Sequence, residues 1–290
     1  MAELIATYTV VNGGVYALLA IGFSLIFGVA RLINLAHTGF FMLGAFSLYL
    51  FIRLLGWGYP EAIVLTLVIV TLLGILAYRF LIDRIREHTG AVLLITVALA
   101  MIMENVILWL FGGEVRGIPL LVNGYVTISG IKVSNQNILT LGVVVVVIII
   151  VWLLLNKTKL GIALRATAQD PEIANLMGIS VSRTLLITMA LATALAAAAG
   201  ILLAPLRGAV STMWQSPMVI VMVIVVLGGL GSIKGSIIGA FIIALVEQLS
   251  VFLLPQGGYL VDTFVLLAMV IVLVARPGGL FGIILEEERL

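Results

Sequence analysis

Ionisable side chains are rare in the apolar stretches of this sequence, and they are the first candidates for chemistry. Glu104 and Glu247 lie within long apolar runs, and Arg31 and His37 flank a short polar break. A charged group is costly in a bilayer, so each is a candidate for a functional site. His37 can carry protons or contact a substrate, or it can simply hydrogen-bond the backbone groups freed by a helix break. Glu247 can face a water-filled path or bond a neighbouring helix.

Catalytic and cofactor-binding motifs are missing. The sequence holds no cysteine and only 2 histidines, which leaves no Cys/His metal cluster. The stretch GGLGSIKGS has glycines and a lysine but lacks the spacing of a phosphate-binding loop. Neither HExxH nor a serine-hydrolase elbow occurs. The sequence therefore predicts no metal, no cofactor and no enzyme activity. We expect the protein to move or anchor something, and any ATP to be hydrolysed by another polypeptide.

The composition is that of an integral membrane protein. Hydrophobic residues make up 63% of the 290 residues and charged residues 10%, against about 45–50% and ~25% in soluble domains. Because a spanning helix needs about 20 apolar residues, the sequence predicts an all-α, polytopic membrane helix bundle in a single domain, 1–290. The nine expected spans are about 9–30, 39–56, 61–79, 90–111, 137–155, 184–206, 216–231, 236–254 and 259–275.

Two polar breaks leave the span count open between eight and nine. Residues 31–39 can be a full loop or a break inside one irregular helix, and the same holds for 228–235. Each break precedes a Gly-Ala-Phe triplet, at Gly44 and at Gly239. Paired Gly-interrupted segments can mark an internal repeat around a transport pathway, although two short matches in an apolar chain can also arise by chance.

Helix packing faces are easier to place. One stripe of small residues repeats every four positions in the sixth span, and a GxxxG pattern opens the eighth. Small residues let helix backbones approach closely, within this chain or against a partner subunit. The residues are Ala192, Ala196, Gly200, Ala204, Gly235 and Gly239.

Residues 112–136 differ in composition from the predicted spans. They are rich in glycine, and Val126, Ile128, Ile131 and Val133 alternate around Ser129-Gly130. This pattern is typical of a small hairpin, here outside the bilayer.

The 15 Lys and Arg residues indicate an orientation. With the N-terminus outside and the C-terminus in the cytoplasm, the outer loops hold only four of them, and the inner loops hold the rest, which agrees with the positive-inside rule. The outer four are Arg53, Arg116, Lys132 and Arg207.

The longest polar interval, 156–183, contains a short capped helix. Asp170 is a good N-cap, Pro171 suits the first helical position, and Gly178 suits the residue just past the end. A helix over 171–177 is too short to be stable alone, so neighbouring spans must hold it. Such a helix at the cytoplasmic face favours a socket for a partner, although an ordinary loop helix would show the same signals.

Three stretches resemble one known family. NGGVYALLAIGFSLIFG followed by INLAHTGFFMLGAF resembles the opening of the branched-chain amino-acid ABC importer permeases. LGIALRATAQDPEIANLMGIS resembles their cytoplasmic coupling segment, and VLGGLGSIKGSIIGAFIIALVE their late Gly-rich stretch. The resemblance covers nearly the whole chain in the same order. It is less specific for substrate, because importers of urea, short amides and aromatic acids have related permeases.

The resemblance implies a permease in a bacterial or archaeal cytoplasmic (inner) membrane. Its implied partners are a second, related permease forming a heterodimer, two cytoplasmic ATPase subunits and an extracytoplasmic amino-acid-binding protein, with membrane lipid around them and no nucleic acid. A competing class is an ATP-independent secondary transporter or channel with His37, Glu104 and Glu247 as a proton relay. A membrane scaffold without transport has little support.

The resemblance also assigns residues. The coupling helix corresponds to Asp170–Met177 with its flanks, and Asn34 and His37 match the family's Asn-x-Ala-His run. The expected coupling residues are Arg165, Ala166, Asp170, Pro171, Glu172, Ala174, Met177, Gly178 and Ile179. The expected pathway residues are Asn34, His37, Gly44, Glu104 and Glu247.

Overall fold

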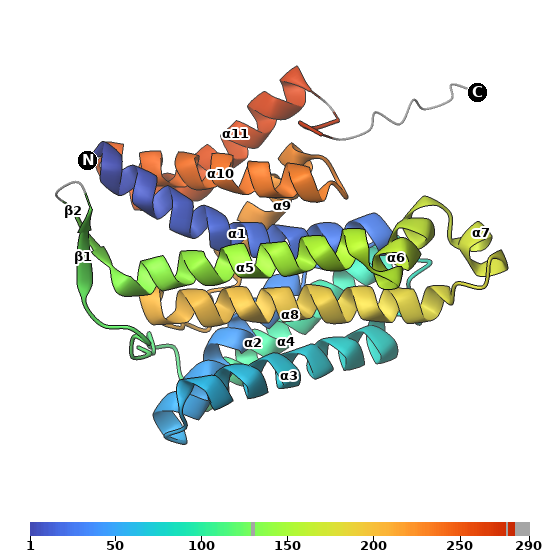
Figure 1. Cartoon of the computed structure of the whole chain (residues 1–290), viewed down its shortest axis with the longest axis horizontal. Coiled ribbons are helices and arrows are strands. Elements are labelled where there is room, and N and C mark those ends of the chain that lie inside the picture. The colour runs from blue at the N-terminus through green and yellow to red at the C-terminus, as the bar shows by residue number, and fades with distance from the viewer. Residues whose placement is uncertain (129–130, 277, 282–290) are drawn as a thin grey trace.

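A computed structural model describes residues 1–128, 131–276 and 278–281 of the chain (Figure 1). Almost all of it is helical. The helices are α1 Ala2–Ala30, α2 His37–Tyr49 with η1 Leu50–Leu54, α3 Tyr59–Ala77 with η2 Tyr78–Ile82, α4 Thr89–Phe111, α5 Asn135–Lys157, α6 Lys159–Gln169, α7 Pro171–Leu176, α8 Val181–Arg207, α9 Gln215–Gly228, α10 Ile233–Leu253, η3 Gly257–Leu260 and α11 Val261–Ala275. The strands are β1 Tyr125–Ile128 and β2 Ile131–Ser134.

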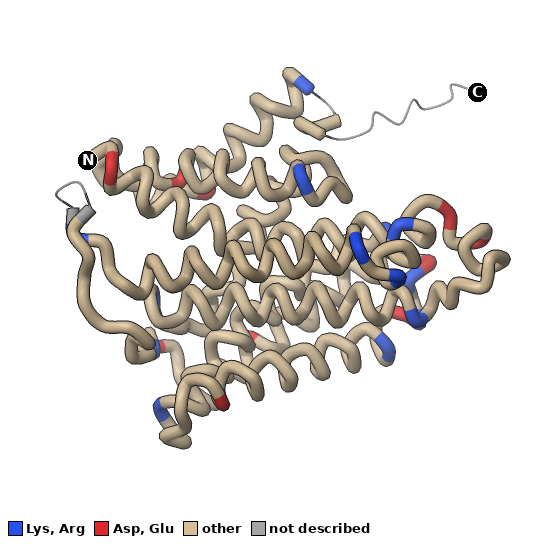
Figure 2. The backbone as a smooth tube through the Cα atoms, in the orientation of Figure 1, with Lys and Arg blue, Asp and Glu red and all other residues tan. Residues whose placement is uncertain are grey.

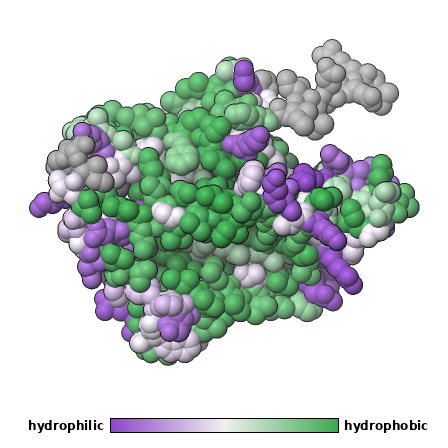
Figure 3. Space-filling view, in the orientation of Figure 1, coloured by the Kyte–Doolittle hydropathy of each residue, from purple (hydrophilic) through white to green (hydrophobic). Residues whose placement is uncertain are grey.

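Eight helical segments of the described chain are long and apolar enough to cross a membrane, which confirms the polytopic bundle. The predicted seventh span is instead the short helix α9, of 14 residues. An irregular stretch, 208–214, precedes it. On the face that Figure 3 shows, a broad apolar belt lies between hydrophilic residues gathered at the two ends. One end carries β1, β2 and the N-terminus, and the other carries α6 and α7 (Figure 1). We call them the hairpin end and the α7 end.

Helix α1 forms the centre of the bundle. In its most apolar window 83% of the residues are buried, against 22% for α4 and for α5. α1 packs on α8 and α10 along its length, and α2 packs on α8. A continuous run from Val11 to Ile26 is buried, so neighbouring side chains cover α1 there. A helix that is apolar all round and fully enclosed is a core helix.

The first polar break turns back into the bundle. α1 ends at Arg31, whose φ of 53° lies in the left-handed region, and residues 31–36 then run inward. His37, the first residue of α2, reaches the carbonyl of Leu19 in α1. Leu19 lies eleven residues before the end of α1, or roughly 16 Å along the axis. α2 therefore begins well inside the bundle, and the break is a re-entrant stretch rather than a full loop.

The second break is a tight turn at the α7 end. Glycines at both sides let α9 and α10 approach: a Cβ on Gly235 would lie 1.9 Å from the carbonyl oxygen of Gly228. The turn also touches α1, because Gly231 lies against Gly28. The two breaks thus differ in geometry, although both Gly-Ala-Phe triplets lie in helices that follow them. An internal repeat stays a prediction.

The small-residue stripes pack within this chain. A Cβ on Gly200 of α8 would lie 2.1 Å from the carbonyl oxygen of Phe41 in α2. Gly44 of α2 faces Ala197 of α8 in the same contact, and Gly239 of α10 faces α9 at Ile224. These positions are packing faces, as expected.

The predicted hairpin is present. β1 and β2 pair antiparallel, with Val126 opposite Val133, while its tip, Ser129-Gly130, lies outside the described residues. The loop that contains it is fastened at two points. The Gln136 side chain in α5 accepts hydrogen bonds from the backbone amides of Leu121 and Val122. Arg116 forms a two-way backbone bridge with Ala209, just after α8.

Candidate functional site: the capped helix α7 and the polar groups inside the bundle

Helix α7 begins as its sequence predicts. The Asp170 carboxylate accepts hydrogen bonds from the backbone amides of Glu172 at 2.8 Å and Ile173 at 2.9 Å. Pro171, at the first helical position, has no amide to satisfy. Two of the free donors at this helix end therefore have a fixed acceptor, and the carboxylate charge also favours the positive end of the helix dipole.

The other end of α7 closes in a Schellman motif. The Ile179 amide donates to the Ala174 carbonyl and the Gly178 amide to the Asn175 carbonyl, both at 3.0 Å. Gly178 has φ of 84°, which a residue without Cβ adopts most readily. The helix ends at Leu176 with Met177 as its C-cap, one residue shorter than expected.

The free face of α7 is apolar. Leu176 is 86% exposed, Met177 78% and Ile173 59%, while Ala174 is buried. Three large apolar side chains on a helix of six residues cannot be explained by packing within the chain. A small exposed apolar cluster on a rigid, doubly capped support is suited to contact with another protein.

An unpredicted helix, α6, anchors α7 to the bundle. Thr158 caps it by accepting from the Gly161 amide at 3.2 Å. Gly161 packs on the last turn of α5, where a Cβ would lie 2.0 Å from the Leu155 carbonyl oxygen. The Arg165 guanidinium donates to that same carbonyl. The signals for α6 were Thr158 and the apolar positions Leu160 and Leu164, in an interval where α7 was the one helix predicted.

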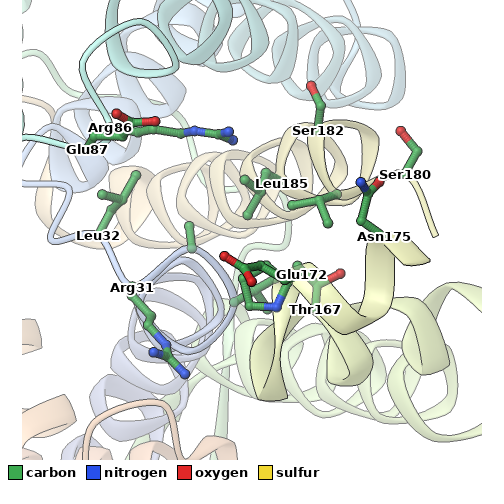
Figure 4. A pocket seen from close by; sticks show the side chains of 14 residues that line it. Arg31, Leu32, Arg86, Glu87, Thr167, Glu172, Asn175, Ser180, Ser182 and Leu185 are labelled. Atoms are coloured by element: carbon green, nitrogen blue, oxygen red, sulfur yellow. The ribbon is translucent and has the colours of Figure 1, made fainter. Parts of the chain in front are cut away.

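A cavity of about 660 Å³ separates α7 from the chain that follows α1. Both polar and apolar side chains line it, and Figure 4 shows Glu172 of α7 on one side, Arg31 at the end of α1 on another, and Arg86 across from them. The segment that holds the expected coupling residues thus lies beside this cavity. α7 is held mainly by its two neighbours in the sequence, α6 and α8, and not by broad packing on the bundle.

The expected pathway residues are distributed over separate places. His37 and Asn34 lie at the re-entrant stretch. The imidazole Nε2 lies 3.0 Å from the Leu19 carbonyl oxygen, and Gly22 leaves room for the ring, because a Cβ there would be 2.8 Å from it. The Asn34 side chain accepts from the Ala36 amide at 3.0 Å. Asn34 therefore satisfies a backbone amide at the break, whereas His37 reaches a carbonyl in the interior of α1, and its role stays a prediction.

Glu104 lies on α4 beside the start of α9. Its carboxylate accepts a hydrogen bond from the Trp214 indole at 2.7 Å and another from the Gln215 amide at 3.2 Å. The carboxylate is half-buried, and the next residue, Asn105, is exposed. Glu104 is roughly 10 Å from the end of α4, so it stands within the apolar belt. The two donors hold it in a fixed position beside the outer surface of α4.

Glu247 is part of a contact between two helices. Its carboxylate lies 3.3 Å from the Arg207 guanidinium at the end of α8, and the Glu247 side chain is 8% exposed. Glu247 lies in the central part of α10, on the side toward the hairpin end. Gly44 serves helix packing, as described above. No group of acidic or histidine side chains suited to a metal occurs in the described part of the chain.

Comparisons with known proteins agree with this architecture. A family model described as "Branched-chain amino acid transport system / permease component" matches residues 5–274. The high-affinity branched-chain amino acid transport system permease LivH of Escherichia coli (strain K12) is 29% identical, over 93% of this chain and 92% of LivH. BraD of Pseudomonas aeruginosa, a permease protein of the same kind of system, is 27% identical over 93% of this chain and 92% of BraD. A probable LivH of Methanocaldococcus jannaschii is also 27% identical, over 97% and 93%.

A solved structure, PsaBC from Streptococcus pneumoniae in complex with Fab, shares the fold. It has a TM-score of 0.51 and 13% identity over 93% of this chain and 91% of that one. The family match extends over nearly every helix described above, from α1 to α11. This multi-pass membrane protein therefore belongs to the family of permease components of branched-chain amino acid transport systems.

Proposed function

We propose that this chain is a translocation subunit of an ATP-driven importer for branched-chain amino acids. The single observation that carries the proposal is the family match over residues 5–274, together with relatives named for this transport. A second permease, two cytoplasmic ATPases and an extracytoplasmic binding protein complete the assembly. A permease for urea, short amides or aromatic acids is the alternative within the same fold.

The coupling site is α7 with its flanks. Exposed Ile173, Leu176 and Met177 enter a groove on one ATPase, and the capping by Asp170 and Gly178 makes the helix move as a unit. The cavity beside α7 gives it room to move. Because α6 is fixed to the end of α5 and α8 follows α7 directly, the motion passes into two full-length spans.

The α7 end faces the cytoplasm in this proposal. Figure 2 shows Lys and Arg gathered at that end, on α6, on the loop around Arg86 and at the start of α10. Fewer lie at the hairpin end, and basic residues favour the cytoplasmic side. The N-terminus and the hairpin are then outside, where the binding protein docks on residues 112–136, and the C-terminus is cytoplasmic.

Within the bilayer, Glu104 is the group best placed to meet an amino acid. It is held by Trp214 and Gln215, and a fixed carboxylate attracts the ammonium group of a passing zwitterion. The exposed neighbours on α4 are mostly apolar, including Met101 and Ile102, and suit a branched aliphatic side chain. Asn34, His37 and Glu247 are proposed to shape the bundle around this route.

Reconstitution tests the proposal. Proteoliposomes that contain both permeases and both ATPases should accumulate radiolabelled leucine only when ATP and the binding protein are supplied. Unlabelled valine and isoleucine should compete, while urea, short amides and aromatic acids should not. Accumulation driven by a proton gradient without ATP would instead support a secondary transporter, and competition by one of the other solutes would reassign the substrate.

A further inference from the structure

A groove on the membrane-facing side of the bundle is not used by the proposed transport mechanism. It lies between α1, α5, α6 and α10 and has a volume of about 680 Å³. Its long walls come from α5 and α10, and its floor from α1, where Ser24 and Gly28 line it. Figure 1 shows α5 and α10 on either side of α1 on the near face, with α6 at one end.

The walls of the groove are apolar and remain uncovered by the described chain. Ile149 is 50% exposed and Trp152 is 52% exposed on α5, and Ile237 faces them from α10. Both helices are candidate membrane spans, so the groove opens sideways at the level of the bilayer. Its natural neighbours there are acyl chains rather than water.

One end of the groove is basic. Arg165 of α6 and Lys234 in the first turn of α10 both line it, and both are exposed. The Arg165 guanidinium is already oriented by the Leu155 carbonyl. No carboxylate is among the residues that line the groove. The first turn of α10 also presents the positive end of a 21-residue helix, which reinforces the attraction for an anion.

We propose that this groove binds an anionic phospholipid from the leaflet at the α7 end. The phosphate lies between Arg165 and Lys234, and one acyl chain follows Ile149 and Trp152. A basic pocket between membrane helices, continuous with an apolar groove, matches both parts of such a lipid. An exposed Trp near the same end suits the border between acyl chains and headgroups. A small soluble anion would use only the basic end and leave the apolar walls uncovered.

The bound lipid joins α6 to α10. Because α6 anchors α7, the lipid connects the base of the coupling helix to α10, a helix that α6 itself contacts little. The inference rests on the chain being a membrane protein, and it holds for any transported solute. Its failure would therefore leave the proposed transport function intact.

Photo-crosslinking in proteoliposomes of the full assembly tests the inference. Two probes carry the same diazirine acyl chain, one on phosphatidylglycerol and one on phosphatidylcholine. Peptide mapping should find the phosphatidylglycerol probe roughly 30-fold more often than the phosphatidylcholine probe on the groove segments of α5 and α10, because each of the two basic residues is worth about 1 kcal/mol. Lys234→Gln should lower that preference about fivefold, as expected for one basic residue near an anionic lipid.

Two further variants make the result specific. Lys234→Arg keeps the charge and should keep the preference. Lys157→Gln removes an exposed charge at the end of α5 that does not line the groove, and should also leave the preference unchanged. Equal labelling by both probes, or an equal loss in Lys157→Gln and Lys234→Gln, would overturn the inference. So would the absence of lipid labelling together with protein crosslinks that place the second permease in the groove.

Discussion

The exposed apolar tip of α7 gives the sharpest prediction for the coupling site. Leu176 is 86% exposed, so its side chain contributes little to the stability of the isolated chain. If the tip enters an ATPase groove, burial of a leucine is worth about 1.5–3 kcal/mol. Leu176→Ser should then weaken ATPase binding by ~2 kcal/mol, which is roughly a 30-fold rise in Kd.

The assay is titration of the purified ATPase against the permease pair in nanodiscs. Val115→Ser is the matched control, because Val115 is 65% exposed at the hairpin end and loses a similar apolar surface. We expect its Kd to equal that of the unmodified chain. The reasoning is refuted if Leu176→Ser binds the ATPase as tightly as the control, with α7 shown to be intact by hydrogen exchange.

Three further changes test other parts of the structure. Gly178 has φ of 84°, so Gly178→Ala should destabilise the end of α7 by about 1 kcal/mol. The change should appear as roughly fivefold faster amide exchange at that end, and Gly178→Asn should have a smaller effect. Gly200→Val should prevent α2 from packing on α8, since even a Cβ would lie 2.1 Å from a backbone oxygen, and should abolish the monodisperse peak in gel filtration. Gly142→Ala, in open space on α5, should leave that peak unchanged. Glu104→Gln should lower ATP-driven leucine uptake by about tenfold or more, as for loss of a charge-assisted contact. Glu61→Gln, at the exposed start of α3, should leave uptake unchanged, and ATPase binding should be normal in both.

Local signals were sufficient to predict α7 from sequence. Asp170, Pro171 and Gly178 act within a few residues of the helix ends that they define, so the caps can be recognised without knowing the tertiary structure. The hairpin and the small-residue packing faces were predicted for the same reason. α6 was missed because its amphipathic pattern is short and is placed between charged residues.

The features that depend on distant contacts could not be predicted. The polar break after α1 was compatible with a full loop or a break inside one irregular helix. In the structure it joins two separate spans, and the contact between His37 and Leu19 shows that the second of them begins inside the bundle. Glu247 meets Arg207, a partner 40 residues away, and a single sequence does not reveal such a pair. The predicted seventh span, 216–231, differs from α9 mainly at its end, because residues 229–231 form the tight turn into α10.

The attachment of the loop between α4 and α5 has a consequence for communication across the membrane. Gln136 ties that loop to the start of α5, and the bridge between Arg116 and Ala209 ties it to the end of α8. At the opposite ends of these two helices, α6 follows α5 and α7 precedes α8. In the proposed assembly, a binding protein that docks on this loop therefore acts on the same two helices, α5 and α8, on which an ATPase bound at α7 acts from their opposite ends. By thermodynamic linkage the effect is reciprocal. If the binding protein changes the affinity for the ATPase by some factor, the ATPase changes the affinity for the binding protein by the same factor.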